Sequence, residues 1–247
     1  MTAISTTTVA IDYPESDGKP VGETDAHRRE ILYIVDTLDR YFADVLDVYV
    51  SGNLMFYYEE GNPSAVVSPD VFVVKGVKKG LRRIYKLWEE GQAPCVVIEM
   101  TSRSTRLEDK GNKRALYAML GVREYFLFDP LGEYLKPPLQ GYTLVGTEYA
   151  AMIPDPDGKL LSRELGMKLY RDDTYLRLID LETGEEVVRT DDLGPALRAA
   201  EEQARAAEEQ ARAAEEQARA ESAARRLAEE ELERLRAELR RLRGEDS

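Results

Sequence analysis

The sequence predicts an α/β fold with a mixed central sheet flanked by helices, followed by a long C-terminal helix. Runs rich in Val, Ile and Phe at 68–74, 95–100 and 124–128 are typical of buried strands. Segments with helical periodicity at 26–42 and 107–120 lie before or between these strands. From residue 195 the chain becomes rich in Ala, Glu, Arg and Gln, all good helix formers.

The composition narrows the classes of protein to consider. The only cysteine, Cys95, lies in an apolar run, which excludes an intramolecular disulfide framework and a cysteine metal cluster and suggests a reducing cytoplasm. There is neither a signal-peptide pattern nor an apolar run near ~20 residues, so no membrane segment is expected. The net charge of -13 argues against strong non-specific DNA binding.

The first part of the chain reads as a lead-in followed by a folded domain. Residues 1–22 contain proline and glycine without periodicity and are expected to be extended, whereas 23–190 should form the main domain. Thr24 or Asp25 can cap a helix over 26–42. Two strands, 45–50 and 54–58, are expected next, joined by a tight hairpin turn at 51–53.

The middle of the domain contains a predicted crossover unit. The strand at 95–100 is followed by a helix over 107–120, ended by Gly121, and then by a strand at 124–129. The two strands should therefore be parallel or near neighbours in one sheet. Short segments at 142–145, 168–170 and 175–179 are expected to form peripheral antiparallel hairpins.

The C-terminal tail, 196–243, carries a seven-residue repeat. Alanines and then leucines recur at alternating spacings of three and four, with Leu232, Leu235, Leu239 and Leu242 at the end. This pattern is compatible with a coiled-coil dimer or with a single solvated helix. In either case the tail would serve spacing and assembly rather than chemistry.

Two acids interrupt the apolar strands, Asp70 after Pro69 and Glu99 after Ile98. An unpaired carboxylate in such a strand costs several kcal/mol or becomes protonated, so a metal, a cation or hydrogen-bond donors are expected beside it. Oxygen ligands on rigid strands suit Mg²⁺ or Mn²⁺, which can activate water and polarise a phosphate ester. Asp70 could alternatively be a simple turn cap.

Several further residues are candidates for the same site. Lys113 is spaced four residues from both Asp109 and Tyr117 and could neutralise charge on a phosphate, although Asp109 and Lys113 could also form an exposed ion pair. Lys110 is the alternative lysine, and Glu30 on the first helix is a possible additional metal ligand. His27 is the only histidine, which excludes multi-histidine metal sites.

Six cations between residues 75 and 86 have no acid among them in the sequence. This stretch could contact phosphates or could be a solvated surface. Both interpretations are open at the level of sequence.

Residues 67–74, 97–102, 109–117 and 121–130 together resemble the Uma-type putative restriction endonucleases, of the PD-(D/E)XK nuclease superfamily. The resemblance covers about residues 25–179 and implies a restriction-endonuclease-like core. It also implies that Asp70 and Glu99 bind the metal, with the backbone carbonyl of Met100, and that Lys113 is the catalytic lysine. The superfamily pattern expects lysine two residues after the second acid, where this chain has Thr101.

The predicted function is a Mg²⁺-dependent or Mn²⁺-dependent endonuclease acting on DNA, assembled as a homodimer through the tail. RNA as substrate is left open by the sequence. The alternative is a nuclease fold without activity that acts as a coiled-coil interaction or regulatory module. The charge of the body favours this alternative. The tail carries 11 Arg and 14 acids, a net charge of -3, which leaves -10 of the total -13 on the body.

Overall fold

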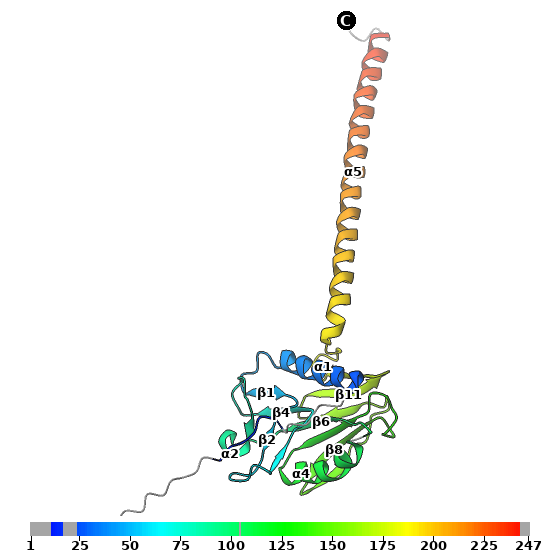
Figure 1. The fold of residues 1–247 in the computed structure, drawn as a ribbon. Helices are drawn as coiled ribbons and strands as arrows, with labels where there is room; N and C mark the ends of the chain where they lie inside the picture. Colours follow the sequence, from blue (N-terminus) through cyan, green and yellow to red (C-terminus); the bar gives the residue numbers. More distant parts are fainter. Residues whose placement is uncertain (1–10, 17–23, 104, 243–247) are drawn as a thin grey trace, which may run out of the picture. The chain divides into compact units, whose positions relative to one another are not determined.

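The computed structural model describes residues 11–16, 24–103 and 105–242. The chain divides into two compact units, Met1–Asp191 and Asp192–Ser247, which are considered separately. Figure 1 shows a mixed α/β body in the first unit and a single helix in the second. Among the described residues, no helix has the length and apolar character needed to cross a membrane.

A six-stranded mixed sheet forms the centre of the first unit. Its spatial order is β1 (Val48–Ser51), β4 (Val71–Lys75), β6 (Val96–Met100), β7 (Glu124–Phe128), β8 (Leu139–Val145) and β9 (Glu148–Ala151). Only β6 and β7 are parallel, as the crossover pattern predicts, and the other neighbours are antiparallel. The predicted mixed sheet is therefore confirmed.

The two faces of the sheet are covered by different elements. Helix α1 (Asp25–Tyr41) and a second sheet, β10 (Leu160–Ser162), β11 (Met167–Asp172) and β12 (Tyr175–Asp180), contribute to the core on one face. Helix α4 (Arg114–Met119) and a small sheet of β2 (Phe56–Tyr57), β3 (Val66–Val67) and β5 (Tyr85–Lys86) contribute to the other. Figure 1 shows α1 and α4 on opposite sides of the sheet.

Side-chain alternation assigns the residues of each strand to these two faces. In β4, Val71 and Val73 pack toward α1, whereas Phe72 and Val74 belong to the core on the α4 side. In β6, Val97 lies on the α4 side between residues that face α1. Helix α1 itself forms as predicted, with Thr24 as its N-cap and buried apolar residues at helical spacing.

The crossover segment is helical but irregular. It consists of α3 (Arg106–Glu108), a π-helical turn η1 (Asp109–Lys113) and α4. Gly121 follows with φ of +78°, a backbone conformation that favours glycine, so the predicted helix end is confirmed. The short helix α2 (Leu87–Glu90) lies between β5 and β6.

The predicted hairpin across 51–53 is wrong. Strand β1 pairs with β4, whereas β2 pairs with β3 and β5 in a different sheet. The connection instead packs against the start of β4, where Asn53 N donates to Pro69 O at 2.9 Å. Local turn chemistry favoured a hairpin, but contacts with a distant strand determine the path of the chain.

The segment that includes 142–145 is also not peripheral. Strand β8 pairs directly with β7 in the central sheet. This close packing needs Gly141, because a Cβ there would lie 2.7 Å from Met152 Sδ and 2.9 Å from Phe126 Cε1. The prediction of antiparallel strands is confirmed for β11 and β12.

The second unit is occupied by helix α5 (Thr190–Leu242), a single α-helix of 53 residues that begins in the last residues of the first unit. Leu232 and Leu235 are 49% and 51% exposed on the isolated chain. Pairing of this helix with a second one remains a prediction. Of the predicted lead-in, residues 1–10 and 17–22 lie outside the described residues, whereas Tyr13 packs against the rings of Tyr57 and Trp88.

Candidate functional site

The register of β4 and β6 brings the two predicted acids together. Val71 lies opposite Ile98, so continuing this antiparallel register by one residue sets Asp70 opposite Glu99. By alternation both share the sheet face of Phe72 and Val97. Asp70 N donates to Glu99 Oε2 at 3.4 Å, and Met100 N donates to Asp70 Oδ2 at 2.7 Å.

The crossover segment supplies a lysine and a tyrosine to the same carboxylate. Lys113 Nζ lies 2.9 Å from Glu99 Oε2, and Tyr117 OH donates to Glu99 Oε1 at 2.7 Å. Glu99 has no exposed surface, and the Lys113 side chain is 12% exposed. The structure thus brings Asp70, Glu99 and Lys113 into one cluster.

A third acid, Asp109, lies beside this lysine. Its Oδ1 is 3.6 Å from Lys113 Nζ, and the residue is 1% exposed. Neither carboxylate oxygen accepts a hydrogen bond within the described part of the chain. The Asp109–Lys113 ion pair therefore forms, but it is buried and not exposed as the sequence alternative has it. Both residues lie in the π-helical turn. Such turns occur frequently at functional sites.

The cluster has an unusual electrostatic balance. Burial and the neighbouring Glu99 raise the pKa of Asp70 well above its ordinary value. Burial, followed by Glu99, raises the pKa of Asp109 to about 6. Burial opposes charge on Lys113, but the three surrounding carboxylates outweigh it and raise the pKa of this lysine, which therefore remains an ammonium at neutral pH.

These residues fit a divalent cation. Three acids surround one lysine, so ionisation of all four groups leaves two buried negative charges in excess. In the described residues no three His, Cys, Asp or Glu side chains form a metal-binding group. The donors near Asp70 are instead two carboxylates and the Met100 backbone, a set that suits Mg²⁺, which typically uses one or two carboxylates and keeps several waters.

Two residues that the sequence associates with the site have other surroundings. Lys110 is exposed, whereas Lys113 contacts Glu99. Thr101, at the position where the superfamily pattern has lysine, is fully buried, and its Oγ1 has no hydrogen-bond partner among the described residues. Its carbonyl lies 2.9 Å from His27 Nε2, so His27 ties α1 to the end of β6.

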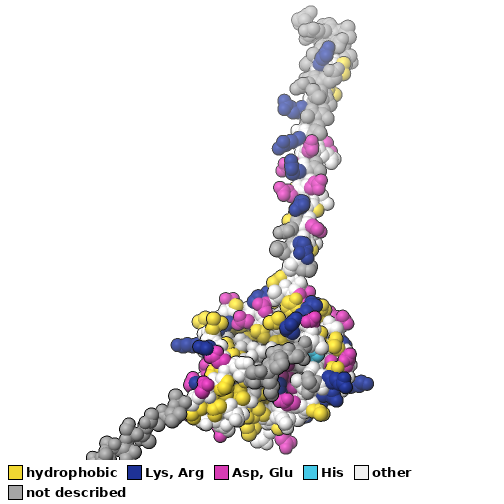
Figure 2. Space-filling view, in the orientation of Figure 1, with side chains coloured by type: hydrophobic (Ala, Val, Ile, Leu, Met, Phe, Trp, Pro, Cys, Tyr) yellow, Lys and Arg dark blue, Asp and Glu magenta, His cyan; other side chains and the backbone are white. Residues whose placement is uncertain are grey.

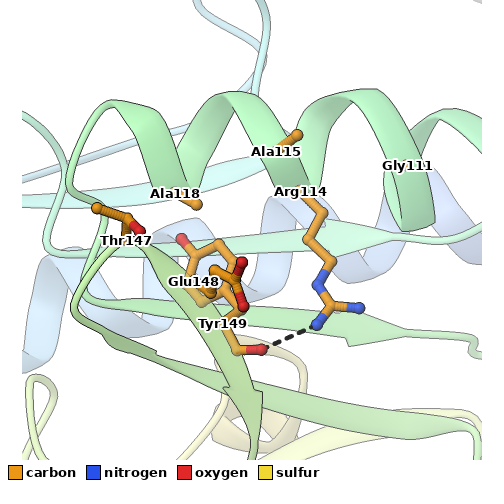
Figure 3. Close-up of a pocket in the computed structure, with 7 residues that line it drawn as sticks. All are labelled: Gly111, Arg114, Ala115, Ala118, Thr147, Glu148 and Tyr149. Atoms are coloured by element: carbon orange, nitrogen blue, oxygen red, sulfur yellow. Dashed lines mark hydrogen bonds between the residues drawn. The ribbon is translucent and has the colours of Figure 1, made fainter.

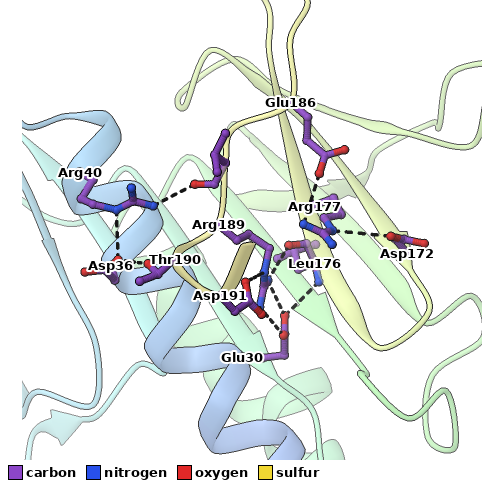
Figure 4. A network of polar contacts seen from close by, with 11 residues as sticks. Glu30, Asp36, Arg40, Asp172, Leu176, Arg177, Glu186, Arg189, Thr190 and Asp191 are labelled. Carbon is purple, nitrogen blue, oxygen red and sulfur yellow. Dashed lines mark hydrogen bonds and ion pairs between the residues drawn. The ribbon is translucent and has the colours of Figure 1, made fainter. Parts of the chain in front are cut away.

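Glu30, the suggested additional metal ligand, is engaged by a buried arginine (Figure 4). Arg189 Nη2 donates to Glu30 Oε1 at 2.8 Å, and Arg189 Nη1 donates to Glu30 Oε2 at 3.1 Å. Leu176 N donates to Glu30 Oε2 at 2.9 Å. Both oxygens of Glu30 are therefore bound by protein donors, and this carboxylate is not part of the Asp70–Glu99 cluster.

A hollow of about 340 Å³ lies next to α4 but does not include the acid cluster (Figure 3). It is lined by Gly111, Arg114, Ala115, Ala118, Thr147, Glu148 and Tyr149. Arg114 Nη2 crosses it to donate to Tyr149 O at 3.0 Å. This hydrogen bond satisfies a backbone carbonyl of β9, the edge strand of the central sheet, where backbone groups would otherwise lack a partner strand.

Sequence reasoning missed two features of the site. For the burial of Asp109, the sequence offered only one indication, the spacing of four residues between Asp109 and Lys113. For Gly52 the sequence offered no indication, because the role of this glycine depends on a distant strand. A Cβ at this position would lie 2.3 Å from the Asp70 carbonyl oxygen. Only glycine allows the β1–β2 connection to approach the backbone of Asp70 this closely.

Comparison with known proteins gives a matching family model and similar solved structures, of which one is described here. The family model Uma2, described as "Putative restriction endonuclease", matches residues 5–174. A crystal structure of a putative nuclease belonging to DUF820 from Anabaena variabilis is 13% identical, covers 58% of this chain and 75% of that chain, and has a TM-score of 0.43. That likeness is too low to assign residues or chemistry. No curated protein matches the chain.

Proposed function

Because the chain belongs to the Uma2 family, described as putative restriction endonucleases, we propose that it is a metal-dependent nuclease that hydrolyses phosphodiester bonds of DNA. The family match confirms the resemblance in the sequence and supports a nuclease. The metal requirement, Mg²⁺ or Mn²⁺, and DNA as the substrate are our own proposals. They rest on the chemistry of the residues around Glu99.

One observation carries the proposal: a cross-strand pair of acids beside a buried lysine. Asp70, directly before β4, lies opposite Glu99 on β6 when the register of the two strands is continued by one residue, and Lys113 Nζ lies 2.9 Å from Glu99 Oε2. A purely structural role would be served by fewer acids, because each buried carboxylate must be protonated or balanced. The excess negative charge supports a role in binding a divalent cation.

We assign the following roles. Asp70, Glu99 and the Met100 carbonyl would hold Mg²⁺, which when bound would supply Lewis-acid activation of water and of the phosphoryl group. Lys113 would stabilise negative charge on the attacking oxygen or on the phosphate, since its raised pKa keeps it protonated. Tyr117 donates to Glu99 Oε1 and would fix the orientation of that carboxylate.

A nicking assay on supercoiled DNA tests this assignment. We expect metal-dependent nicking by the wild-type chain and a loss of at least about a hundredfold in both Glu99→Gln and Lys113→Ala. Lys159→Ala, at a lysine that contacts Tyr170 instead of the acid cluster, is the control and should cleave like wild type. Unchanged nicking in the Glu99 and Lys113 variants would contradict the proposal.

Calorimetry separates this function from the alternative of an inactive interaction module. We expect Mg²⁺ or Mn²⁺ to give binding heat that disappears in Asp70→Asn. A wild-type chain with neither nicking nor metal-binding heat would instead support the interaction module.

We also propose that α5 mediates formation of a homodimer, which would bring two sites to one duplex. The leucine seam supports this, because Leu232 and Leu235 are about half exposed on the single chain. The full chain should have twice its mass of 27.9 kDa in light scattering, and Leu232→Glu/Leu235→Glu should restore the monomer mass. Ala237→Glu, off the seam, is the control. A wild-type monomer would overturn the proposal.

A further inference from the structure

A nuclease needs cations to bind the phosphate backbone, but this chain is acidic overall. Its net charge is -13, and Figure 2 shows acidic and basic side chains interspersed over the visible face of the body. Phosphate contacts supply most of the non-specific affinity of DNA-binding proteins. Binding of DNA next to the acid cluster therefore requires cations there that are not already paired with acids.

The most basic stretch in the sequence, 75–86, is largely neutralised by acids from elsewhere. Its ion pairs are Lys75–Glu164, Arg82–Glu90, Arg83–Glu15 and Lys86–Glu89. This stretch also begins at the end of β4 that is farther from the acid cluster, because Asp70 precedes the strand and Lys75 is its last residue. With about 3.4 Å per residue, the two positions are roughly 17 Å apart.

A second group of cations follows β6 directly. Residues 101–115 contain five cations, Arg103, Arg106, Lys110, Lys113 and Arg114, and two acids, Glu108 and Asp109, for a local charge of +3. Arg103 and Lys110 are exposed and Arg106 is half-buried. In the described part of the chain, no ion pair engages any of these three, in contrast to four of the six cations of 75–86.

The loop after β7 adds to the surface formed by Arg103, Arg106 and Lys110. Since β6 and β7 are parallel, the residues that follow them emerge at the same edge of the sheet, a common location of ligand sites. Tyr134 comes from the β7–β8 loop, and its ring centroid lies 6.0 Å from the Arg106 guanidinium carbon.

Asp129 fixes the conformation of this loop. The buried carboxylate accepts hydrogen bonds from the backbone N–H groups of Gly132 and Leu135, both at 2.9 Å, and from that of Tyr134. The loop therefore holds the Tyr134 ring against Arg106 before any ligand binds.

From this arrangement we infer that Arg103, Arg106 and Lys110 bind phosphates of the DNA strand that enters the Asp70–Glu99 site, with Tyr134 positioning Arg106. The inference rests on the proposed nuclease function and adds the surface that holds its substrate. Glu99 is two residues before Thr101, where this segment begins, so a strand held here would pass beside the acids. Arginine suits this role because its planar guanidinium can donate to phosphate in a bidentate manner.

DNA binding can be measured separately from cleavage in the full-length Glu99→Gln background. Fluorescence anisotropy of a labelled duplex is followed between about 50 and 200 mM salt. We expect Arg103→Ala/Arg106→Ala/Lys110→Ala to weaken binding at least about tenfold and to reduce the slope of log K against log salt by about 3, since each phosphate contact contributes about 0.9. Lys75→Ala/Lys78→Ala/Arg83→Ala removes the same charge and should leave the slope unchanged.

A second pair of variants tests the positioning role of Tyr134. Tyr134→Phe keeps the ring beside Arg106 and should bind like wild type, whereas Tyr134→Ala should weaken binding several-fold. Circular dichroism of each variant confirms that it is folded.

The inference is overturned if both triple variants weaken binding equally, or if the background protein does not bind DNA at low salt. If instead the proposed nuclease function is wrong, the result differs: the wild-type chain does not nick DNA, but the salt-dependent binding of DNA persists.

Discussion

Replacing Arg189 with methionine is expected to lower the free energy of unfolding by about 3–5 kcal/mol, since it leaves Glu30 as a buried charge without its partner. Arg189 is 1% exposed and Glu30 is 2% exposed. The guanidinium also donates to Leu176 O at 3.0 Å and lies 5.0 Å from the rings of both Tyr33 and Tyr175. Hydrogen bonds, charge and packing are thus lost together.

The measurement is urea unfolding of the full chain at about pH 7, followed by the fluorescence of Trp88, the only tryptophan. Arg40→Met is the matched control, because Arg40 pairs with Asp36 at the surface of α1 and should contribute less than about 1 kcal/mol. Equal losses in the two variants would contradict the importance of the buried pair.

A double variant distinguishes the charge effect from lost packing. Replacing both partners, Glu30→Leu/Arg189→Met, removes the unpaired charge and should recover a large part of the stability lost in Arg189→Met alone. A double variant that is less stable than the single one would show that the arginine acts mainly through Leu176 and the two tyrosine rings.

Asp109→Asn is expected to stabilise the protein at neutral pH. Burial raises the pKa of Asp109 from its ordinary 3.8 to about 6, so the folded state holds this proton more tightly than the unfolded state. The associated stability is present below about pH 4 and is lost as the pH rises through about 6. With about 1.4 kcal/mol per pH unit, the variant should gain about 3 kcal/mol at pH 7 and little at pH 4.

Unfolding at a series of pH values measures this difference between wild type and variant. Glu108→Gln, at the exposed neighbouring acid, is the control and should change stability by less than about 0.5 kcal/mol. A constant difference between wild type and Asp109→Asn from pH 4 to pH 7 would contradict the raised pKa of the buried Asp109.

The predictions that succeeded depend on local patterns. The spacing of Ile31, Ile34 and Leu38 predicts α1, and the apolar runs predict β4, β6 and β7, because burial and periodicity leave few alternatives. The predictions that failed involve partners distant in sequence. The segment 51–53 has the composition of a hairpin turn, but it packs against Pro69 and Asp70 instead.

For the site, too, local patterns identified some residues, whereas others depended on contacts between distant parts of the chain. A carboxylate in an apolar strand is costly wherever it occurs, so Asp70 and Glu99 were candidates from the sequence alone. The sequence does not select between Lys110 and Lys113, because both lie in the first half of the predicted helix over 107–120 and point in different directions from it. In the structure both lysines lie in the π-helical turn, but only Lys113 contacts Glu99, whereas Lys110 is exposed.

The sequence by itself determined the positions of the main buried strands along the chain, the long C-terminal helix, the anomalous acids and the family of the protein. Tertiary structure alone decided which charges are paired with distant partners: Glu30 with Arg189, Lys75 with Glu164 and Arg83 with Glu15. It also left Arg103, Arg106 and Lys110 without an ion pair among the described residues. The physical reason is that helix and strand patterns arise from neighbours along the chain, whereas the energy of a charge depends on its burial and on groups brought close only by folding.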